Sequence, residues 1–178
     1  MPGVSARREQ ILDVAERVLE EVGLDRFGIG ELARALGIRP PSLYKHFASL
    51  EEIQHALISR ALRRLGDALA DATELAGFCR VYRACALGAP QLYRLMTDRP
   101  LNRGLLDPGA EPAGMAGILR LFGETESRHP RARAAWAGAH GLVSLEIAGR
   151  FPPSADLDQS WAELVAAFAK HPGAPKGA

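Results

Sequence analysis

The sequence predicts an all-α fold with about nine helices. Apolar residues recur at three- and four-residue spacing through almost the whole chain, which is the period of a helix with one buried face. No segment alternates apolar and polar residues over the length of a strand, and we find no internal repeat. The 178 residues leave room for one domain or for two small ones.

Glycine, proline and capping residues place the ends of these helices. Ser49 with Glu52 three residues later forms a capping box before a long apolar stripe. Asp98–Pro112 is rich in proline and glycine, and such long loops are often lids or disordered segments. The predicted helices cover, in order, about Ser5–Val22, Ile29–Leu36, Pro40–Phe47, Ser49–Leu69, Glu74–Leu87, Pro90–Thr97, Ala113–Ser127, Pro130–Arg150 and Ala155–Lys170.

Composition gives few global signals. The formal net charge is only +1, so any signal for nucleic-acid binding must be local. Cys79 and Cys85 are six residues apart, which puts them on roughly opposite sides of a helix and argues against a disulfide or a metal pair. Since we find neither a signal-peptide core nor an apolar run long enough to cross a bilayer, we expect a cytoplasmic protein without membrane contact.

The segment from Gly28 to Phe47 meets the requirements of a helix-turn-helix. Ala33 supplies the small residue where the two helices cross, and Gly37 supplies the turn residue that tolerates positive φ. An ordinary pair of core helices does not explain the short second helix or its outward polar side chains. Ile29, Leu32, Leu36, Ile38, Leu43 and Phe47 are predicted to point inward, and Arg39, Ser42, Tyr44, Lys45 and His46 outward.

The run Leu43-Tyr44-Lys45-His46-Phe47 resembles the signature of recognition helices in TetR-family transcription regulators. The preceding Leu-Ala-x-x-Leu-Gly-Ile and the single leading helix are similar to that family as well. The resemblance implies that the second helix of the motif enters the major groove of DNA. It implies base-edge or flanking backbone contacts for Arg39, Pro40, Pro41, Ser42 and Lys45, and phosphate contacts for Tyr44 and His46.

Physical chemistry agrees with this assignment. Residues near the N-terminus of a recognition helix reach base edges, and Arg39 could pair with guanine through two hydrogen bonds. A tyrosine hydroxyl on a phosphate positions a protein without reading sequence. Two alternatives stay open, since Tyr44 could be half-buried packing and Lys45 could be solvated surface.

Several positions depart from the family pattern. Leu50 stands where a lysine is usual, and Gly28 and Gly30 stand where threonine or another polar residue usually caps the first motif helix. Residues 1–47 carry seven basic and seven acidic residues, so their formal charge is zero. We therefore expect modest nonspecific affinity and a shallow salt dependence. Arg7 and Arg8, expected ahead of the first helix, could add DNA contacts or form an unstructured basic terminus.

The second half resembles one C-terminal type of this family, the WHG type, through Trp136, His140 and Gly141. Gly141 is expected to let a neighbouring helix approach closely. The resemblance implies a homodimer in which the last two helices of each copy pack together as a four-helix bundle. Two-fold dimers matched to palindromic half-sites are also the usual solution for a DNA-binding unit this small.

A small-molecule effector would need a cavity between the helices of the C-terminal body. Met and aromatic residues at helical spacing are core residues more often than they are ligand contacts, so this assignment depends mostly on the resemblance. A ligand that prefers a conformation in which the two helix-turn-helix domains of the dimer are wrongly spaced for the operator would lower operator affinity. The candidate lining residues are Phe78, Tyr82, Cys85, Tyr93, Met96, Met115, Phe122, Trp136 and His140.

These observations predict a ligand-responsive repressor that binds a palindromic operator as a dimer. Residues 1–48 would form the helix-turn-helix domain, residues 49–170 the ligand-binding and dimerisation domain, and residues 171–178 a disordered tail. An activator and a helix-turn-helix-derived adaptor with weak DNA binding are the alternatives. The chain has no dinucleotide fingerprint, zinc-protease motif or nucleophile elbow, so we expect no enzyme, no cofactor and no metal site.

Overall fold

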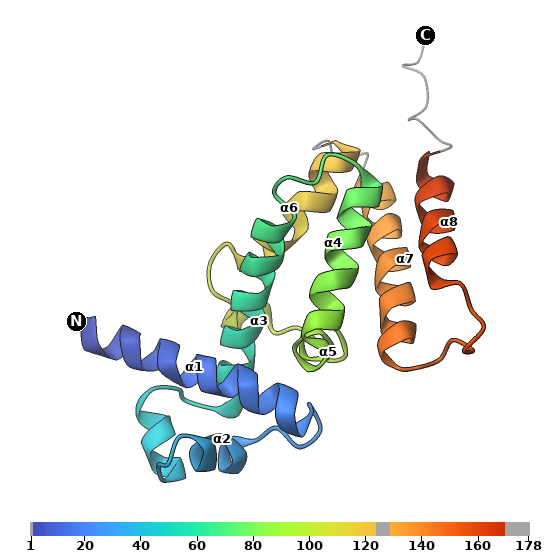
Figure 1. Cartoon of the computed structure of the whole chain (residues 1–178). Helices are drawn as coiled ribbons and strands as arrows, with labels where there is room; N and C mark the ends of the chain where they lie inside the picture. Colours follow the sequence, from blue (N-terminus) through green and yellow to red (C-terminus); the bar gives the residue numbers. More distant parts are fainter. Residues whose placement is uncertain (1, 124–128, 170–178) are drawn as a thin grey trace. The chain divides into compact units, whose positions relative to one another are not determined.

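The structure is a computed structural model that describes residues 2–123 and 129–169. Within these residues the secondary structure consists of helices alone (Figure 1). Their bounds are α1 Pro2–Val22, α2 Ile29–Ala35, the 3-10 helix η1 Pro40–Lys45, α3 Leu50–Ala68, α4 Leu75–Gly88, α5 Pro90–Thr97, the 3-10 helix η2 Arg103–Leu105, α6 Ala110–Phe122, α7 His129–Ile147 and α8 Leu157–Ala169. No described helix is long and apolar enough to cross a membrane.

The predicted all-α fold is confirmed, and most helix ends agree with the sequence within a few residues. The first helix differs because it begins at Pro2, so Arg7 and Arg8 lie inside α1 and not ahead of it. The sixth α-helix begins at Ala110, three residues earlier than predicted. The end of that predicted helix at Ser127 and the predicted disordered tail lie outside the described residues.

The chain divides into two compact units. Unit 1 consists of the described residues up to Arg64 together with Ala89–Gly114. Unit 2 consists of Leu65–Gly88 and the described residues from Met115 onward. Helices α3 and α6 contribute residues to both units.

Unit 1 packs α1, α2, η1, α5 and most of α3 around one apolar core. The carboxylate of Glu20 on α1 accepts hydrogen bonds from the backbone N–H groups of Gln91 and Leu92, at 3.2 and 2.8 Å. These N–H groups belong to the first turn of α5, where helix geometry leaves them without partners. The Gln91 amide oxygen accepts in turn from the N–H of Leu24, at 3.0 Å, so α1 caps the start of α5 and α5 holds the turn that follows α1.

The loop between α5 and α6 is anchored to α3 inside unit 1. The backbone N–H of Asn102 donates to Nε2 of the buried His55, at 3.1 Å. The N–H of Asp107 donates to the Ser59 hydroxyl at 2.9 Å, and Arg63 forms an ion pair with Asp107 at 2.8 Å. This ordered loop excludes the disordered segment that its composition allowed.

Unit 2 packs α4, α7 and α8 against one another, as Figure 1 shows. Helices α7 and α8 pack closely at Gly138, where an added Cβ would lie 2.6 Å from Cδ1 of Leu164. The expectation that Gly141 provides such an approach is wrong within the chain, because a Cβ at Gly141 would meet no described atom within 4 Å. Gly141 is therefore on an open side of α7.

Candidate DNA interface and effector groove

The turn between α2 and η1 has the backbone geometry of a helix-turn-helix. Gly37 has φ +65°, and its N–H donates to the carbonyl of Arg34 at 3.1 Å. The N–H of Ile38 donates to the carbonyl of Ala33 at 3.0 Å. This pair of bonds is a Schellman motif, which ends α2 and redirects the chain into η1. The positive φ predicted for Gly37 is confirmed by this geometry, and Ala33 is buried, as expected for a small residue of the inner face.

Helix η1 begins with two prolines. Neither proline has an N–H to donate, and the first bond runs from the N–H of Ser42 to the carbonyl of Arg39, at 2.9 Å. Such three-residue spacing is typical of 3-10 helices. Leu43 is fully buried and fixes the inner face, so the remaining side chains of the segment are turned outward.

The outward face of η1 carries most of the residues predicted to contact DNA. Arg39, Pro40, Pro41 and Lys45 are exposed, and the exposed fraction of Tyr44 is 54%. Neither Arg39 nor Lys45 forms an ion pair with any described residue. The exposure of Tyr44 removes the half-buried packing alternative.

Two predicted contact residues are less exposed than the others. Ser42 and His46 are half-buried. Among the described residues, Nδ1 of His46 is a buried nitrogen with no hydrogen-bond partner. The ring of His46 is therefore fixed at the edge of the surface rather than extended from it.

Arg8 holds the end of η1 in place. Its guanidinium lies 4.0 Å from the centre of the Phe47 ring, donates to the carbonyl of His46 and pairs with Glu52 at 3.0 Å. Arg8 is thereby committed to contacts within unit 1, which differs from the expected basic terminus. The reason is that Arg8 lies within α1, which places it against Phe47 and Glu52, far away in the sequence.

The predicted capping box at the start of α3 is confirmed, with one difference. The N–H of Glu52 donates to the Ser49 hydroxyl at 3.1 Å. The Glu52 carboxylate accepts from the N–H of Ala48 instead of from Ser49 itself. Glu52 thus joins α1, the end of η1 and the start of α3 through one carboxylate.

The glycines that depart from the family pattern leave the start of α2 without a side-chain cap. Gly28 is the N-cap residue with extended backbone, and no side chain accepts a hydrogen bond there. A Cβ at Gly30 would meet nothing within 4 Å. Leu50 is half-buried against the apolar core of unit 1, so it contributes packing where the family pattern has a lysine.

The nine residues predicted to line an effector pocket fall into separate groups. In unit 2 the Phe78 and Tyr82 rings stack at 5.5 Å, the Trp136 indole donates to the Tyr82 hydroxyl at 3.1 Å, and Trp136 stacks on His140 at 6.0 Å. Phe122 packs edge-on against Phe168. The rest are Cys85, which is exposed, Met115, which is half-buried, and Tyr93 and Met96, which belong to unit 1.

The structure shows a different space, a groove of about 650 Å³ between α4 and α8. None of the nine predicted residues lines it. Its apolar lining includes Ala76, Cys79, Leu87, Trp161, Val165 and Ala166. Burial raises the pKa of the Cys79 thiol to about 11, so the groove contains no thiolate near neutral pH.

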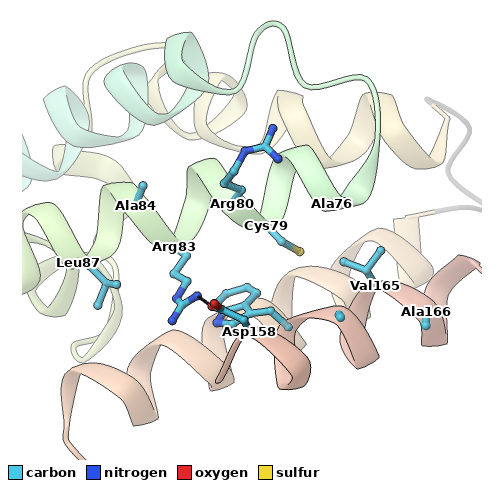
Figure 2. Close-up of a pocket in the computed structure, with 11 residues that line it drawn as sticks. Ala76, Cys79, Arg80, Arg83, Ala84, Leu87, Asp158, Val165 and Ala166 are labelled. Carbon is cyan, nitrogen blue, oxygen red and sulfur yellow. Dashed lines mark hydrogen bonds and ion pairs between the residues drawn. The ribbon is translucent and has the colours of Figure 1, made fainter. Parts of the chain in front are cut away.

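A charged pair crosses the groove from one helix to the other (Figure 2). Arg83 on α4 donates from Nε and Nη2 to the Glu146 carboxylate of α7, at 2.9 and 2.8 Å. Its Nη1 donates to Asp158 on α8, at 2.6 Å. The hydrogen bonds to Glu146 and then to Asp158 raise the pKa of Arg83. Sequence reasoning missed this groove because four of its lining residues are alanines, which carry no chemical signal, and its two walls on α4 and α8 are far apart in the sequence.

Two family models match the chain. Residues 11–57 match the model of bacterial regulatory proteins of the tetR family, and residues 75–168 match the model of the tetracyclin repressor-like C-terminal domain. The chain is 30% identical over 170 residues to the uncharacterized HTH-type transcriptional regulator Rv0681 of Mycobacterium tuberculosis, covering 89% of this chain and 78% of that protein.

Solved structures agree with these matches. The regulatory protein SCO4313 has a TM-score of 0.77 and 25% identity, over 96% of this chain and 98% of that one. A protein of unknown function from Rhodococcus sp. RHA1 has a TM-score of 0.75 and 25% identity, over 92% and 93% of the two chains. TetR of Acinetobacter baumannii, with the substitution Q116A and in complex with minocycline, shares the fold with a TM-score of 0.65 and 19% identity, over 90% and 94%. The chain therefore belongs to the TetR family of helix-turn-helix DNA-binding transcription regulators.

Proposed function

We propose that this regulator is a ligand-responsive repressor that binds a palindromic operator as a homodimer. The observation that carries the DNA-reading part is the outward face of η1. Arg39 and Lys45 have no acidic partner among the described residues, and Tyr44 is the most exposed of the large hydrophobic residues that the structure describes. Cations without partners are free to neutralise phosphates or to pair with base edges.

In this proposal the DNA contacts come from Arg39, Pro40, Pro41, Ser42, Tyr44, Lys45 and His46. Arg39 is the N-cap of η1, where side chains reach base edges. Tyr44 and Lys45 lie further along the exposed face and serve the phosphate backbone. The functional division keeps residues 1–48 as the reading domain and residues 49–170 as the effector and dimer domain.

The open side of α7 supports the homodimer. Five small or apolar residues recur there at three- and four-residue spacing, so they share one helix face. The exposed fraction of Leu145 is 45%, and Gly141 has no described neighbour for a Cβ. A second α7 could approach this face closely. The stripe consists of Ala134, Ala137, Gly141 and Leu145 on α7 and of Ala148 in the turn that follows it.

Two further parts of the proposal have weaker support. The fold relative from Acinetobacter baumannii holds minocycline, which supports a small-molecule effector for this chain as well. The assignment of the C-terminal body to the WHG type depends on Trp136, His140 and Gly141, and it stays a prediction.

The test of DNA reading is an in vitro selection from random duplex DNA at low salt, followed by affinity measurement on the enriched sequence. We expect an inverted repeat, and we expect Tyr44→Ala combined with Lys45→Ala to lose about a hundredfold in affinity. Arg133→Ala is the matched control, because Arg133 is an exposed cation of unit 2 without a described ion pair. Folded dimeric protein that enriches no sequence would contradict the repressor and favour the adaptor.

The homodimer is tested by sedimentation velocity. Leu145→Glu and Gly141→Glu place charges on the open stripe of α7 and should give monomers, since an unpaired charge buried in an interface is costly. Arg133→Ala should leave the dimer intact. Dimers that persist in both glutamate variants would exclude this face of α7 as the interface. Transcription in vitro from a promoter carrying the operator distinguishes repressor from activator.

A further inference from the structure

The groove between α4 and α8 combines an apolar surface with the guanidinium of Arg83, one of whose two carboxylate partners, Asp158, is exposed to solvent. Figure 2 shows Arg83 reaching from α4 toward Asp158, with Cys79, Val165 and Ala166 further along the same groove. The volume of about 650 Å³ lies in the range of small-molecule sites. All lining residues belong to unit 2, so the site is complete within it.

The apolar part exists because small side chains face each other across the groove. Ala76 on α4 and Ala162 and Ala166 on α8 leave space that larger residues would fill, whereas Figure 2 shows the Ala84 side chain on the side of α4 away from α8. The exposed fraction of Leu87 at one end is 42%. Apolar surface of this kind gains free energy when it is covered, which favours a ligand with an apolar body.

The two carboxylates that pair with Arg83 differ in how strongly they are held. Glu146 binds Arg83 through two nitrogens, and its side chain is only 15% exposed. Asp158 binds the remaining Nη1, and its side chain is 88% exposed. An ion pair with a solvent-exposed carboxylate is weak, so Asp158 is the partner that a soluble anion can replace.

The remaining charges of the groove favour an anion as well. Arg80 lines the groove without an ion pair among the described residues, although Figure 2 shows its guanidinium pointing away from α8. Asp158 lies in the first turn of α8, where the helix dipole stabilises negative charge. Because Glu146 keeps its two bonds to Arg83, an anion that replaces Asp158 leaves this guanidinium paired on both sides.

We propose that this groove binds a medium-chain aliphatic carboxylate. Its carboxylate replaces Asp158 at Nη1 of Arg83, and its chain lies over Cys79, Val165 and Ala166. Arg83 and Ala76 are seven residues apart, which corresponds to about 10 Å along α4. An extended chain of about eight to ten carbon atoms covers that length.

Ligand binding in this form releases one contact between α4 and α8. Asp158 loses Arg83, while Glu146 keeps it, so α4 stays joined to α7 but not to the start of α8. This inference depends on the proposed function only where it identifies the carboxylate as the effector. The binding itself is a separate claim with its own measurement.

The test is isothermal titration calorimetry of the full chain with sodium decanoate below its micellar concentration, with 1-decanol as the uncharged probe. We expect decanoate to bind at least about tenfold more tightly than decanol, because hydrogen bonds to charged groups are the stronger class. Asp158→Asn removes the competing carboxylate and should tighten decanoate binding by about threefold. Glu163→Gln is the matched control, since it removes one carboxylate from α8 outside the groove.

Groove filling gives a second, independent variant. Ala166→Phe, or Ala162→Leu if the first does not fold, should weaken decanoate binding at least about tenfold without changing the oligomeric state. Equal affinity for decanoate and decanol, with no effect of Asp158→Asn, would overturn the carboxylate assignment. If neither the parent protein nor any folded variant binds decanoate saturably, the proposed site would be overturned. Filled variants that dissociate the dimer and leave decanoate binding unchanged would show that the groove is an interface between copies.

The effector role is read separately from operator DNA. If decanoate is the effector, it should release bound operator, and the variants should require decanoate concentrations in the same order as their decanoate affinities. Decanoate that binds without releasing DNA overturns only the effector role, and failure of the DNA selection leaves the calorimetric result standing.

Discussion

The face of η1 and the groove of unit 2 both display arginine, but they treat its charge differently. Arg39 on η1 has no acidic partner among the described residues, whereas Arg83 is held by Glu146 and Asp158. A cation that must meet phosphates or bases has to remain free, while a cation that joins three helices has to be neutralised. The comparison teaches that two neutralising carboxylates mark Arg83 as a structural residue, whereas Arg39 is left free for the DNA contact proposed for it.

The largest effect should come from Arg83→Ala. It leaves Glu146 partly buried and without its cation, which should lower the free energy of unfolding by about 3 kcal/mol. Arg39→Ala should change it by less than about 0.5 kcal/mol, because an exposed side chain without partners stabilises little. Urea unfolding of the two variants and the parent measures both values. Equal destabilisation by the two substitutions would remove the distinction between free and neutralised arginine.

For DNA binding we expect the opposite order, with a larger effect of Arg39→Ala than of Arg83→Ala. Arg39→Ala should cost about 1–3 kcal/mol of binding free energy on the selected operator and relax base preference at one position. Lys45→Ala should weaken binding to all sequences alike and make the slope of log affinity against log salt shallower by about one. Titrations of labelled operator and a scrambled duplex at several salt concentrations separate the two roles.

A matched measurement with Arg83→Ala sharpens this result. The variant should keep operator affinity at a temperature where it is folded, apart from any change in dimerisation. If Lys45→Ala lost base preference and Arg39→Ala kept it, the roles assigned to the two cations would have to be exchanged.

The helix-turn-helix could be predicted from the sequence because its backbone demands particular residues. Gly37 is needed at positive φ, Ala33 at a close crossing, and the proline pair at the start of η1. Each demand excludes most amino acids, so the residues themselves report the geometry. Helix bounds and the capping box were predictable for the same reason, and membership of a regulator family confirms that the chain is not an enzyme.

The groove and the partners of individual arginines could not be predicted in this way. Alanines at positions such as Ala162 and Ala166 are compatible with core, surface or cavity, so they carry no signal. Aromatic residues drew attention instead, but Phe78 and Tyr82 are packed in the interior of unit 2. The two alternatives for Arg8 did not include its pairing with Glu52, because that pairing joins residues far apart in the sequence.

The turn itself allows a smaller test. Gly37→Ala should lower the free energy of unfolding by about 1 kcal/mol, because an alanine at φ +65° is strained although its Cβ meets no described atom within 4 Å. Gly30→Ala, in α2 and equally unobstructed, should raise it by about 0.5–1 kcal/mol. Thermal or urea unfolding measures both, and the same sign for the two alanines would contradict the helix-turn-helix backbone described here.

The smallest effect concerns the uncapped start of α2. Gly28→Ser supplies a hydroxyl that can accept a hydrogen bond from the first turn, at a position with extended backbone and no close neighbour. The gain in unfolding free energy should be only a few tenths of a kcal/mol, since glycine is already a tolerated N-cap. Because the family pattern places a polar residue here, operator affinity is the more informative readout. Tighter binding of Gly28→Ser than of Gly28→Ala would show that a hydroxyl at this position reaches the DNA backbone. Equal affinities would mean that the face of η1 alone sets the affinity, and that free cations can compensate for a phosphate contact that the chain lacks.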